Sequence, residues 1–193
     1  MSPVPRYVFT ADADPKRIYH NVLVSIDETR HLNNGQPSAL AAWLDALDIQ
    51  EGEQVIHVGA GVGYYSAIIA EVVGPRGKVV AIEVDEALAA RARANLARWN
   101  TVDVIAQDGS KYDPGPVDVI FVNAGVTHPS GLWLDRVKPG GRLPKRPGSE
   151  CATGQANELG KIFSMQSLRR DLHEPDYTCL VHTKNSCLSS KAI

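Results

Sequence analysis

Cysteine is scarce in this sequence of 193 residues, where it occurs at Cys151, Cys179 and Cys187. An odd number of cysteines at wide spacing, without a Cys-x-x-Cys pair, argues against both a disulfide framework and a zinc site. The sequence therefore predicts reduced thiols, a cytoplasmic location and no bound metal.

Long hydrophobic runs and an excess of charge of one sign are also missing. No apolar stretch approaches the roughly 18 residues that span a bilayer, and the first ten residues, MSPVPRYVFT, lack a charged-then-apolar signal pattern. The 20 basic and 22 acidic residues leave a net charge of -2, which provides no electrostatic reason to expect a polyanionic partner. We therefore predict neither a membrane nor a nucleic-acid partner.

The composition is that of an ordinary globular protein. Hydrophobic residues make up 44% of the chain and charged residues 22%, which excludes a disordered protein, a collagen-like repeat and a coiled coil. The length fits one domain with a real core. We predict a single domain over residues 1–193, divided into an N-terminal arm (1–35), a ligand-binding core (36–143) and an atypical C-terminal segment (144–193).

Short β-rich runs alternate with helical patterns through the core. Such an alternation is typical of an α/β fold, a doubly wound, Rossmann-like and mostly parallel sheet with helices on both faces. The predicted strands cover residues 54–58, 78–83, 102–106 and 117–122, and the predicted helices cover residues 39–47, 63–73, 86–98 and 128–137.

The two ends of the chain lack this regular alternation. The arm contains three prolines and is predicted to be irregular, with at most one helix. After a predicted turn at residues 139–141, the segment 142–147 has two prolines and is poor strand material. Later strands are predicted at 162–163 and 179–181, and residues 184–193 are polar and expected to fray. The C-terminal segment is therefore predicted to be largely irregular.

The most informative stretch is the glycine-rich run from His57 to Tyr64, which reads HVGAGVGY. It lies between a predicted strand and a predicted helix, where an open α/β sheet binds its ligand. Glycines there let the backbone approach a ligand closely. Glu83 follows Gly63 by 20 residues, at the end of the next strand, where a carboxylate can accept both hydroxyls of a ribose. This pattern fits either a dinucleotide or S-adenosylmethionine.

A nicotinamide-dependent oxidoreductase is the less favoured alternative. The dinucleotide fingerprint needs a small residue at the position of Tyr64, and here the third glycine comes one residue early, at Gly63. The run 123–125 (Asn-Ala-Gly) is similar to one in short-chain dehydrogenases, but the sequence contains no Tyr-x-x-x-Lys pair. S-adenosylmethionine is therefore the predicted cofactor.

The Gly-x-Gly-x-Gly run with its acid looks like that of a class I S-adenosylmethionine-dependent methyltransferase. More narrowly, the chain between Tyr19 and Leu143 resembles the protein-L-isoaspartate (D-aspartate) O-methyltransferase family. The matching pieces are the segment 34–39 (NGQPSA), the run 59–64 (GAGVGY), the helix that contains Leu88, Asp108-Gly109, and the segment 138–143 (KPGGRL). The segment before the first strand is the most telling of these pieces.

The resemblance implies a methyltransferase whose cofactor site is spread over the loops that follow the four predicted strands. The cofactor-binding residues that it implies are Gly59, Ala60, Gly61, Gly63, Tyr64, Glu83, Asp108, Gly109 and Asn123. In this superfamily an acid after the third strand often meets the adenine amine, and Asp108 holds that position. The partner implied is a methyl acceptor, either a protein carboxylate or a small molecule.

The acceptor side departs from the family pattern. The family has Ser-x-Pro-His before the first helix, with the serine implicated in catalysis, whereas this chain has Gly35 and Ser38 at the serine and histidine positions. We therefore expect weak or absent methylation of isoaspartyl peptides, unless Gln36, Asn34 or Ser38 supplies the missing hydrogen bond. Gln36 and Asn34 are the predicted catalytic residues because their amides can orient a carboxylate.

Two further questions stay open at this stage. His57 replaces the acid with which the family's first strand usually ends; an amine or hydroxyl acceptor would need a base, but the position of His57 within a strand favours a supporting role. The loss of the family serine also leaves an alternative function, a cofactor-binding or partner-binding domain without catalysis.

Overall fold

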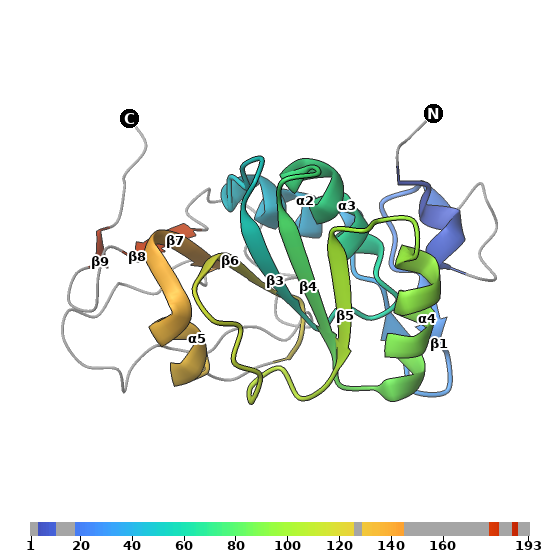
Figure 1. Ribbon diagram of the computed structural model, residues 1–193. Helices are drawn as coiled ribbons and strands as arrows, with labels where there is room; N and C mark the ends of the chain where they lie inside the picture. The colour runs from blue at the N-terminus through green and yellow to red at the C-terminus, as the bar shows by residue number, and fades with distance from the viewer. Residues whose placement is uncertain (1–3, 11–17, 126–128, 145–177, 182–186, 189–193) are drawn as a thin grey trace.

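The main sheet of the protein has seven strands in the order β5-β4-β3-β6-β7-β8-β9 (Figure 1). The computed structural model describes residues 4–10, 18–125, 129–144, 178–181 and 187–188. The strands are β3 (Gln54–Val58), β4 (Lys78–Glu83), β5 (Val102–Ala106), β6 (Val117–Val122), β7 (Val137–Pro144), β8 (Thr178–Val181) and β9 (Cys187–Leu188).

The five strands from β5 to β7 run parallel to one another, and β8 and β9 add an antiparallel edge. From β3 the chain builds outward through β4 to β5, and then returns to pair β6 with the other side of β3. The carboxyl ends of β3 and β6 therefore form the switch point at which open α/β sheets bind ligands. This topology confirms the predicted doubly wound, mostly parallel fold.

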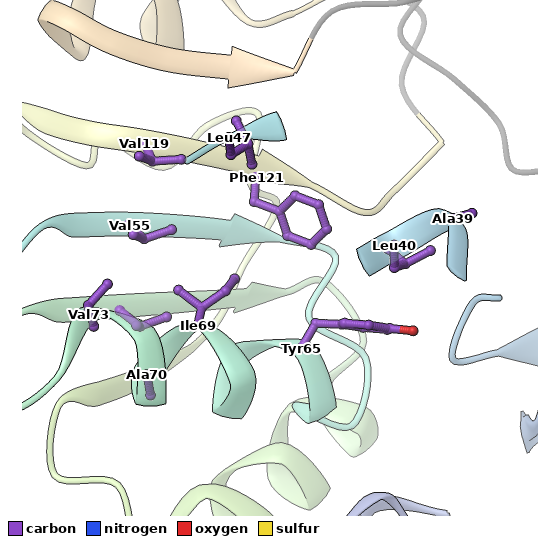
Figure 2. Packing of buried hydrophobic residues seen from close by; sticks show 11 residues of the cluster. Ala39, Leu40, Leu47, Val55, Tyr65, Ile69, Ala70, Val73, Val119 and Phe121 are labelled. Carbon is purple, nitrogen blue, oxygen red and sulfur yellow. The ribbon is translucent and has the colours of Figure 1, made fainter. Parts of the chain in front are cut away.

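Helices cover both faces of the sheet. They are α2 (Pro37–Ala46), α3 (Tyr64–Val73), α4 (Glu86–Leu96) and α5 (Gly131–Arg136). Because strand side chains alternate between faces, Val55 of β3 packs with α2 and α3, as Figure 2 shows, whereas Ile56 packs with Trp133 of α5. Each face of β3 is thus buried, which explains why its sequence is almost continuously apolar. Among the described residues, no helix is long and apolar enough to cross a membrane.

The N-terminal arm contains more structure than its sequence suggests. It has a 3-10 turn, η1 (Arg6–Phe9), and a two-stranded antiparallel hairpin of β1 (Ser25–Asp27) and β2 (Leu32–Asn33). Strands of two and three residues are too short for an alternating pattern to be recognised. The hairpin is tied to α4 by side chains: Arg30 forms an ion pair with Asp85, the N-cap of α4, and Arg91 donates to the carbonyl of Ile26 at 2.9 Å.

Strand β7 corrects two predictions about the end of the core. The Pro-Gly-Gly sequence at 139–141 is no turn between elements, because β7 runs through it, with a register shift against β6 and a left-handed Gly140 (φ 79°). Such a bulge accommodates a proline within a strand. The segment after Gly141, expected to be poor strand material, continues β7 as far as Pro144, because residues 142–144 pair with β8.

Only part of the predicted C-terminal segment can be compared with the structure. Strand β8 confirms the late strand predicted at residues 179–181, and β9 was not predicted. The predicted strand at 162–163, the prolines after Pro144 and most of the polar end lie outside the described residues. The predicted irregularity of that segment, and the division of the chain into arm, core and C-terminal segment, stay predictions.

Gly63 offers a test of the packing between α3 and α4. It is the N-cap of α3 with φ 93°, and an added Cβ would come within 2.7 Å of Leu96 Cδ1 of α4. We expect Gly63→Ala to lower the free energy of unfolding by about 1–2 kcal/mol for the left-handed backbone and by about 1–3 kcal/mol more for overpacking. Gly115→Ala is the matched control, because Gly115 has φ 64° but open space around it. Urea denaturation measures the free energy of unfolding of both variants. Equal decreases in the two variants would show that Leu96 moves aside freely.

Candidate functional site

A cavity of about 560 Å³ lies at the carboxyl ends of β3, β4 and β6. The hairpin of the N-terminal arm forms one wall, and the loops that follow β3, β4, β5 and β6 form the others. Most of the residues predicted for the site line this cavity: Asn34, Gly59, Ala60, Gly61, Tyr64, Glu83, Asp108, Gly109 and Asn123. The structure therefore brings together four loops and an arm that are far apart in the sequence.

The glycines of the first loop have different physical functions. A Cβ on Gly59 would come within 2.6 Å of the Asn123 carbonyl oxygen, so this glycine lets the loops after β3 and β6 approach each other. Gly63 does not line the cavity and instead lets α3 approach α4. Gly61 has φ 55°, and its Cβ would extend toward Ile26 Cδ1, at 3.5 Å, across the cavity. Of the three, Gly61 is the one at which an added Cβ would make only an ordinary van der Waals contact.

Glu83 connects the glycine loop to the end of β4. Its carboxylate accepts a hydrogen bond from the backbone N–H of Gly61 at 2.7 Å and another from that of Asp85 at 3.0 Å. The residue is only 7% exposed, so these two bonds hold the carboxylate in place within the cavity wall. Each carboxylate oxygen accepts more than one hydrogen bond, and Glu83 can therefore also accept from the hydroxyls of a ribose.

The loop after β5 supplies a second acidic side chain. Asp108 accepts hydrogen bonds from the hydroxyl and backbone N–H of Ser110, at 2.7 and 3.0 Å, and these bonds lower the pKa of its carboxyl. Gly109 is packed against Val58, whose Cγ1 would lie 2.7 Å from an added Cβ, and its carbonyl accepts from the indole N–H of Trp133 at 2.8 Å. The loop is therefore fixed from below and presents an ionised acceptor.

The arm separates the two predicted catalytic residues. Asn34 lines the cavity and is 6% exposed. Gln36 caps α2 with its backbone and is not among the residues that line the cavity. Gly35 between them has φ 77°, a conformation that disfavours side chains, and its N–H donates to Asn33 Oδ1 at 3.0 Å. Because of this turn, Asn34 lies in the wall of the cavity and Gln36 lies at the beginning of α2.

Tyr65 is a residue of the cavity that the sequence analysis did not identify. It follows Tyr64 in the first turn of α3, and both line the cavity. The Tyr64 ring packs edge-on against Phe9, with ring centroids 5.5 Å apart. The Tyr65 ring belongs to the core cluster of α2 and α3 (Figure 2), and its hydroxyl is buried with no hydrogen-bond partner among the described residues. In the sequence, Tyr65 cannot be distinguished from an ordinary buried residue of a helix.

His57 lies under the glycine loop and not in the cavity. Its ring is fully buried beside Phe121, and its Nδ1 is 2.7 Å from the Ser66 hydroxyl. Burial lowers the pKa of His57 to about 3, so the imidazole is neutral at physiological pH. A neutral ring sealed from the cavity has no path to an acceptor's proton, which agrees with a supporting role.

The cavity is suited to a nucleoside-bearing ligand. It combines a carboxylate at the end of β4, an ionised acceptor after β5 and the glycine-rich loop after β3. In the described part of the chain, no group of three or more His, Cys, Asp and Glu side chains is arranged to hold a metal ion.

Comparison with known proteins finds a matching family model and relatives of similar sequence. The family model for protein-L-isoaspartate(D-aspartate) O-methyltransferase matches residues 1–150. The chain is 36% identical over 148 residues to protein-L-isoaspartate O-methyltransferase 2 of Archaeoglobus fulgidus, a match that covers 72% of this chain and 65% of that protein. It is 33% identical over 147 residues to the Thermotoga maritima protein-L-isoaspartate O-methyltransferase, covering 72% and 46%. The chain thus spans less than two thirds of the length of these relatives.

Solved structures share the fold. A protein-L-isoaspartate O-methyltransferase superposes with a TM-score of 0.69 at 29% identity, covering 74% of this chain and 47% of that one. A Plasmodium falciparum structure, described as a β-aspartate methyltransferase in complex with S-adenosyl-L-homocysteine, superposes with a TM-score of 0.62 at 19% identity, covering 78% and 74%. At 19% identity this second likeness supports the fold alone.

The buried His57 predicts how stability depends on pH. The pKa of His57 is lowered from 6.5 in the unfolded chain to about 3 on folding. The contribution of the buried neutral ring to the free energy of unfolding is therefore complete above pH 6.5 and is lost progressively as pH falls below 6.5. We expect the free energy of unfolding to drop by about 2 kcal/mol between about pH 8 and about pH 5 through this residue. His57→Gln keeps a polar group near Ser66 and should flatten the profile. Denaturation at a series of pH values tests this; parallel profiles for both proteins would contradict it.

Proposed function

Because the chain belongs to the protein-L-isoaspartate(D-aspartate) O-methyltransferase family, we propose that it binds S-adenosylmethionine in the cavity and methylates a carboxylate. The observation that carries this proposal is the placement of Glu83. A buried carboxylate held against the N–H of Gly61, at the end of the strand next to the switch point, is suited to a ribose. Gly61 lines the same cavity, whose volume of about 560 Å³ leaves room for the rest of such a cofactor.

Residues from all four loops of the cavity would hold the cofactor, each loop contacting a different part of it. Glu83 accepts the ribose hydroxyls, and Asp108, with Gly109 beside it, accepts the adenine amine. The backbone from Gly59 through Ala60 to Gly61 faces the methionine part, together with Asn123. Tyr64 covers this loop from the side of the arm. Gly63 contributes through packing alone, because it does not line the cavity.

When bound, the cofactor supplies an electrophilic methyl group on a sulfonium, so a carboxylate oxygen can bond to the methyl carbon while the electron pair of the carbon–sulfur bond remains on sulfur. The chain needs to provide alignment, which supplies several kcal/mol of the barrier. A carboxylate is already anionic and needs no general base. The sealed and neutral His57 is consistent with that requirement.

The proposed partner is therefore a carboxylate presented by a protein, with no part for nucleic acid. The cytoplasmic location stays a prediction from the cysteine pattern. One observation favours a second candidate function, a cofactor-binding domain without catalysis: the family serine is replaced by Gly35, whose left-handed backbone disfavours any side chain.

Glu83→Ala should weaken the binding of S-adenosylmethionine by about 1–3 kcal/mol, the cost of losing a charge-assisted hydrogen bond. Titration calorimetry with the cofactor provides the measurement. Glu86→Ala is the matched control, since Glu86 is an exposed acid in the first turn of α4, outside the cavity. Unchanged affinity in Glu83→Ala, or tight binding of NAD by the parent protein, would exclude this cofactor site.

Methyl transfer itself is tested with cofactor that carries a labelled methyl group. We expect a protein mixture to become labelled, and the label to be released by mild alkali, because carboxyl methyl esters hydrolyse far more readily than methylamines. Glu83→Ala should reduce the labelling and Glu86→Ala should not. Alkali-stable label would indicate a nitrogen acceptor. Intact cofactor binding without labelling would favour the binding domain.

A further inference from the structure

Asn34 has a buried hydrogen-bond donor without a partner at the wall of the cavity. Its Oδ1 accepts from Arg6 Nη2 at 2.8 Å and from the backbone N–H of Val24 at 3.4 Å. These two donors determine the orientation of the amide, because the opposite orientation would place N–H groups against N–H groups. The Nδ2 group therefore faces away from Arg6, and it has no partner among the described residues.

Arg6 places a positive charge directly behind this amide. Arg6 is 2% exposed, and its guanidinium donates to the carbonyls of Ile18 at 2.7 Å and Gly35 at 3.4 Å, in addition to Asn34. None of the ion pairs within the described residues includes Arg6. A donor bond from a cation to an amide oxygen polarises the amide and strengthens its N–H groups as donors. The charge of Arg6 therefore makes Asn34 Nδ2 a stronger hydrogen-bond donor.

Tyr65 provides a second unpartnered group among the residues that line the cavity. Its side chain is 4% exposed, its hydroxyl has no partner among the described residues, and its ring extends from α3 toward the beginning of α2 (Figure 2). Burial raises the pKa of this hydroxyl, and the positive charge of Arg6 acts on it in the opposite direction. The hydroxyl therefore remains protonated and able to donate, within the field of the Arg6 guanidinium.

We propose that Asn34 Nδ2 and the Tyr65 hydroxyl, backed by the charge of Arg6, bind the carboxylate of the methyl acceptor. This inference rests on the proposed function. Two donors near a buried cation suit an anionic group and disfavour an ammonium, which the Arg6 charge would repel. A carboxylate would give both donors an acceptor and relieve the cost of leaving them unpaired. One carboxylate oxygen held in this way leaves the other free to react.

The remaining candidates for this position are less well placed. Neither Gln36 nor Ser38 is among the residues that line the cavity. Ser38 is exposed, and its backbone N–H donates to Asn21 Oδ1 at 3.0 Å. At Gly35 a serine would have to adopt φ 77°. The hydrogen bond that a serine hydroxyl would supply there is instead available from Asn34 and Tyr65.

The decisive variant is Asn34→Asp. An aspartate keeps the oxygen that accepts from Arg6 and Val24, and so preserves the internal contacts of the arm, but it replaces the donor with a second anionic oxygen. Tyr65→Phe removes the second donor and leaves the ring. The probe is a peptide with one isoaspartyl residue, titrated onto the protein in the presence of S-adenosylhomocysteine, so that binding is measured without turnover. We expect each variant to raise the peptide Kd by about 10- to 100-fold, with the Kd of S-adenosylhomocysteine unchanged.

Asn21→Asp and Tyr7→Phe are the matched controls. Asn21 is exposed near the beginning of α2 and Tyr7 is 54% exposed on η1, and neither lines the cavity. They make the same chemical changes and should leave the peptide Kd unchanged. A third probe, the same peptide with the isoaspartyl carboxylate converted to an amide, should bind the parent protein weakly and should not respond to Asn34→Asp.

The outcomes separate this inference from the proposed function. If the parent binds cofactor and methylates protein carboxylates but the isoaspartyl peptide does not bind, or binds equally to parent and variants, the inference is wrong and the proposed function stands. If the cofactor does not bind the parent protein, the proposed function fails first. A peptide Kd that Asn34→Asp leaves unchanged or lowers would show that Asn34 serves the packing of the arm alone.

Discussion

At the carboxyl ends of β3 and β6, the backbone of Gly59 lies so near the Asn123 carbonyl that any Cβ would come within 2.6 Å of it. The neighbouring N–H groups of Gly59 and Ala60 donate to the Ile82 carbonyl of β4, at 2.9 and 3.0 Å. Three adjacent strands are thus held together at one point just beneath the cavity. The glycine loop, the end of β4 and the loop after β6 take their positions from this contact.

Glu83 extends that constraint from the backbone to a side chain. Because it accepts from the N–H of Gly61, the loop and the carboxylate hold each other in place before any ligand arrives. Preorganised acceptors reduce the ordering cost of binding. The same side of the cavity is closed below by Val58, Gly109 and Trp133, so the sheet side is rigid down to its hydrophobic core.

Sequence reasoning was most successful where a single segment determines its own structure. The bounds predicted for β3, β4, β5 and β6 match the structure, because each is an apolar run that ends in turn residues. The glycine loop and Glu83 were found because they are near in sequence and their chemistry is specific. The roles assigned to these residues remain proposals.

The features that sequence reasoning missed depend on contacts between distant segments. Strand β7 continues through Pro139 because it has partners on both sides, one of them at residues 178–181. The strands of the hairpin are too short to show periodicity. Gln36 and Asn34 look equivalent in the sequence, yet the left-handed Gly35 separates them. In the sequence, Tyr65 resembles an ordinary core residue. The proposed binding role of its hydroxyl depends on Arg6 and Asn34, which lie in other parts of the sequence.

Two arginines of the arm lie in very different dielectric surroundings: Arg30 binds the hairpin to Asp85 of α4, whereas Arg6 binds segments of the arm to one another. Arg30 pairs with Asp27 and Asp85 at the surface, with 44% of its side chain exposed, whereas Arg6 is buried. Dissolved salt screens exposed charges and hardly affects buried ones. Raising the ionic strength will therefore weaken the ion pair between the hairpin and α4 while Asn34 stays bound to Arg6, so that salt acts on the outer contact of the arm and spares its interior.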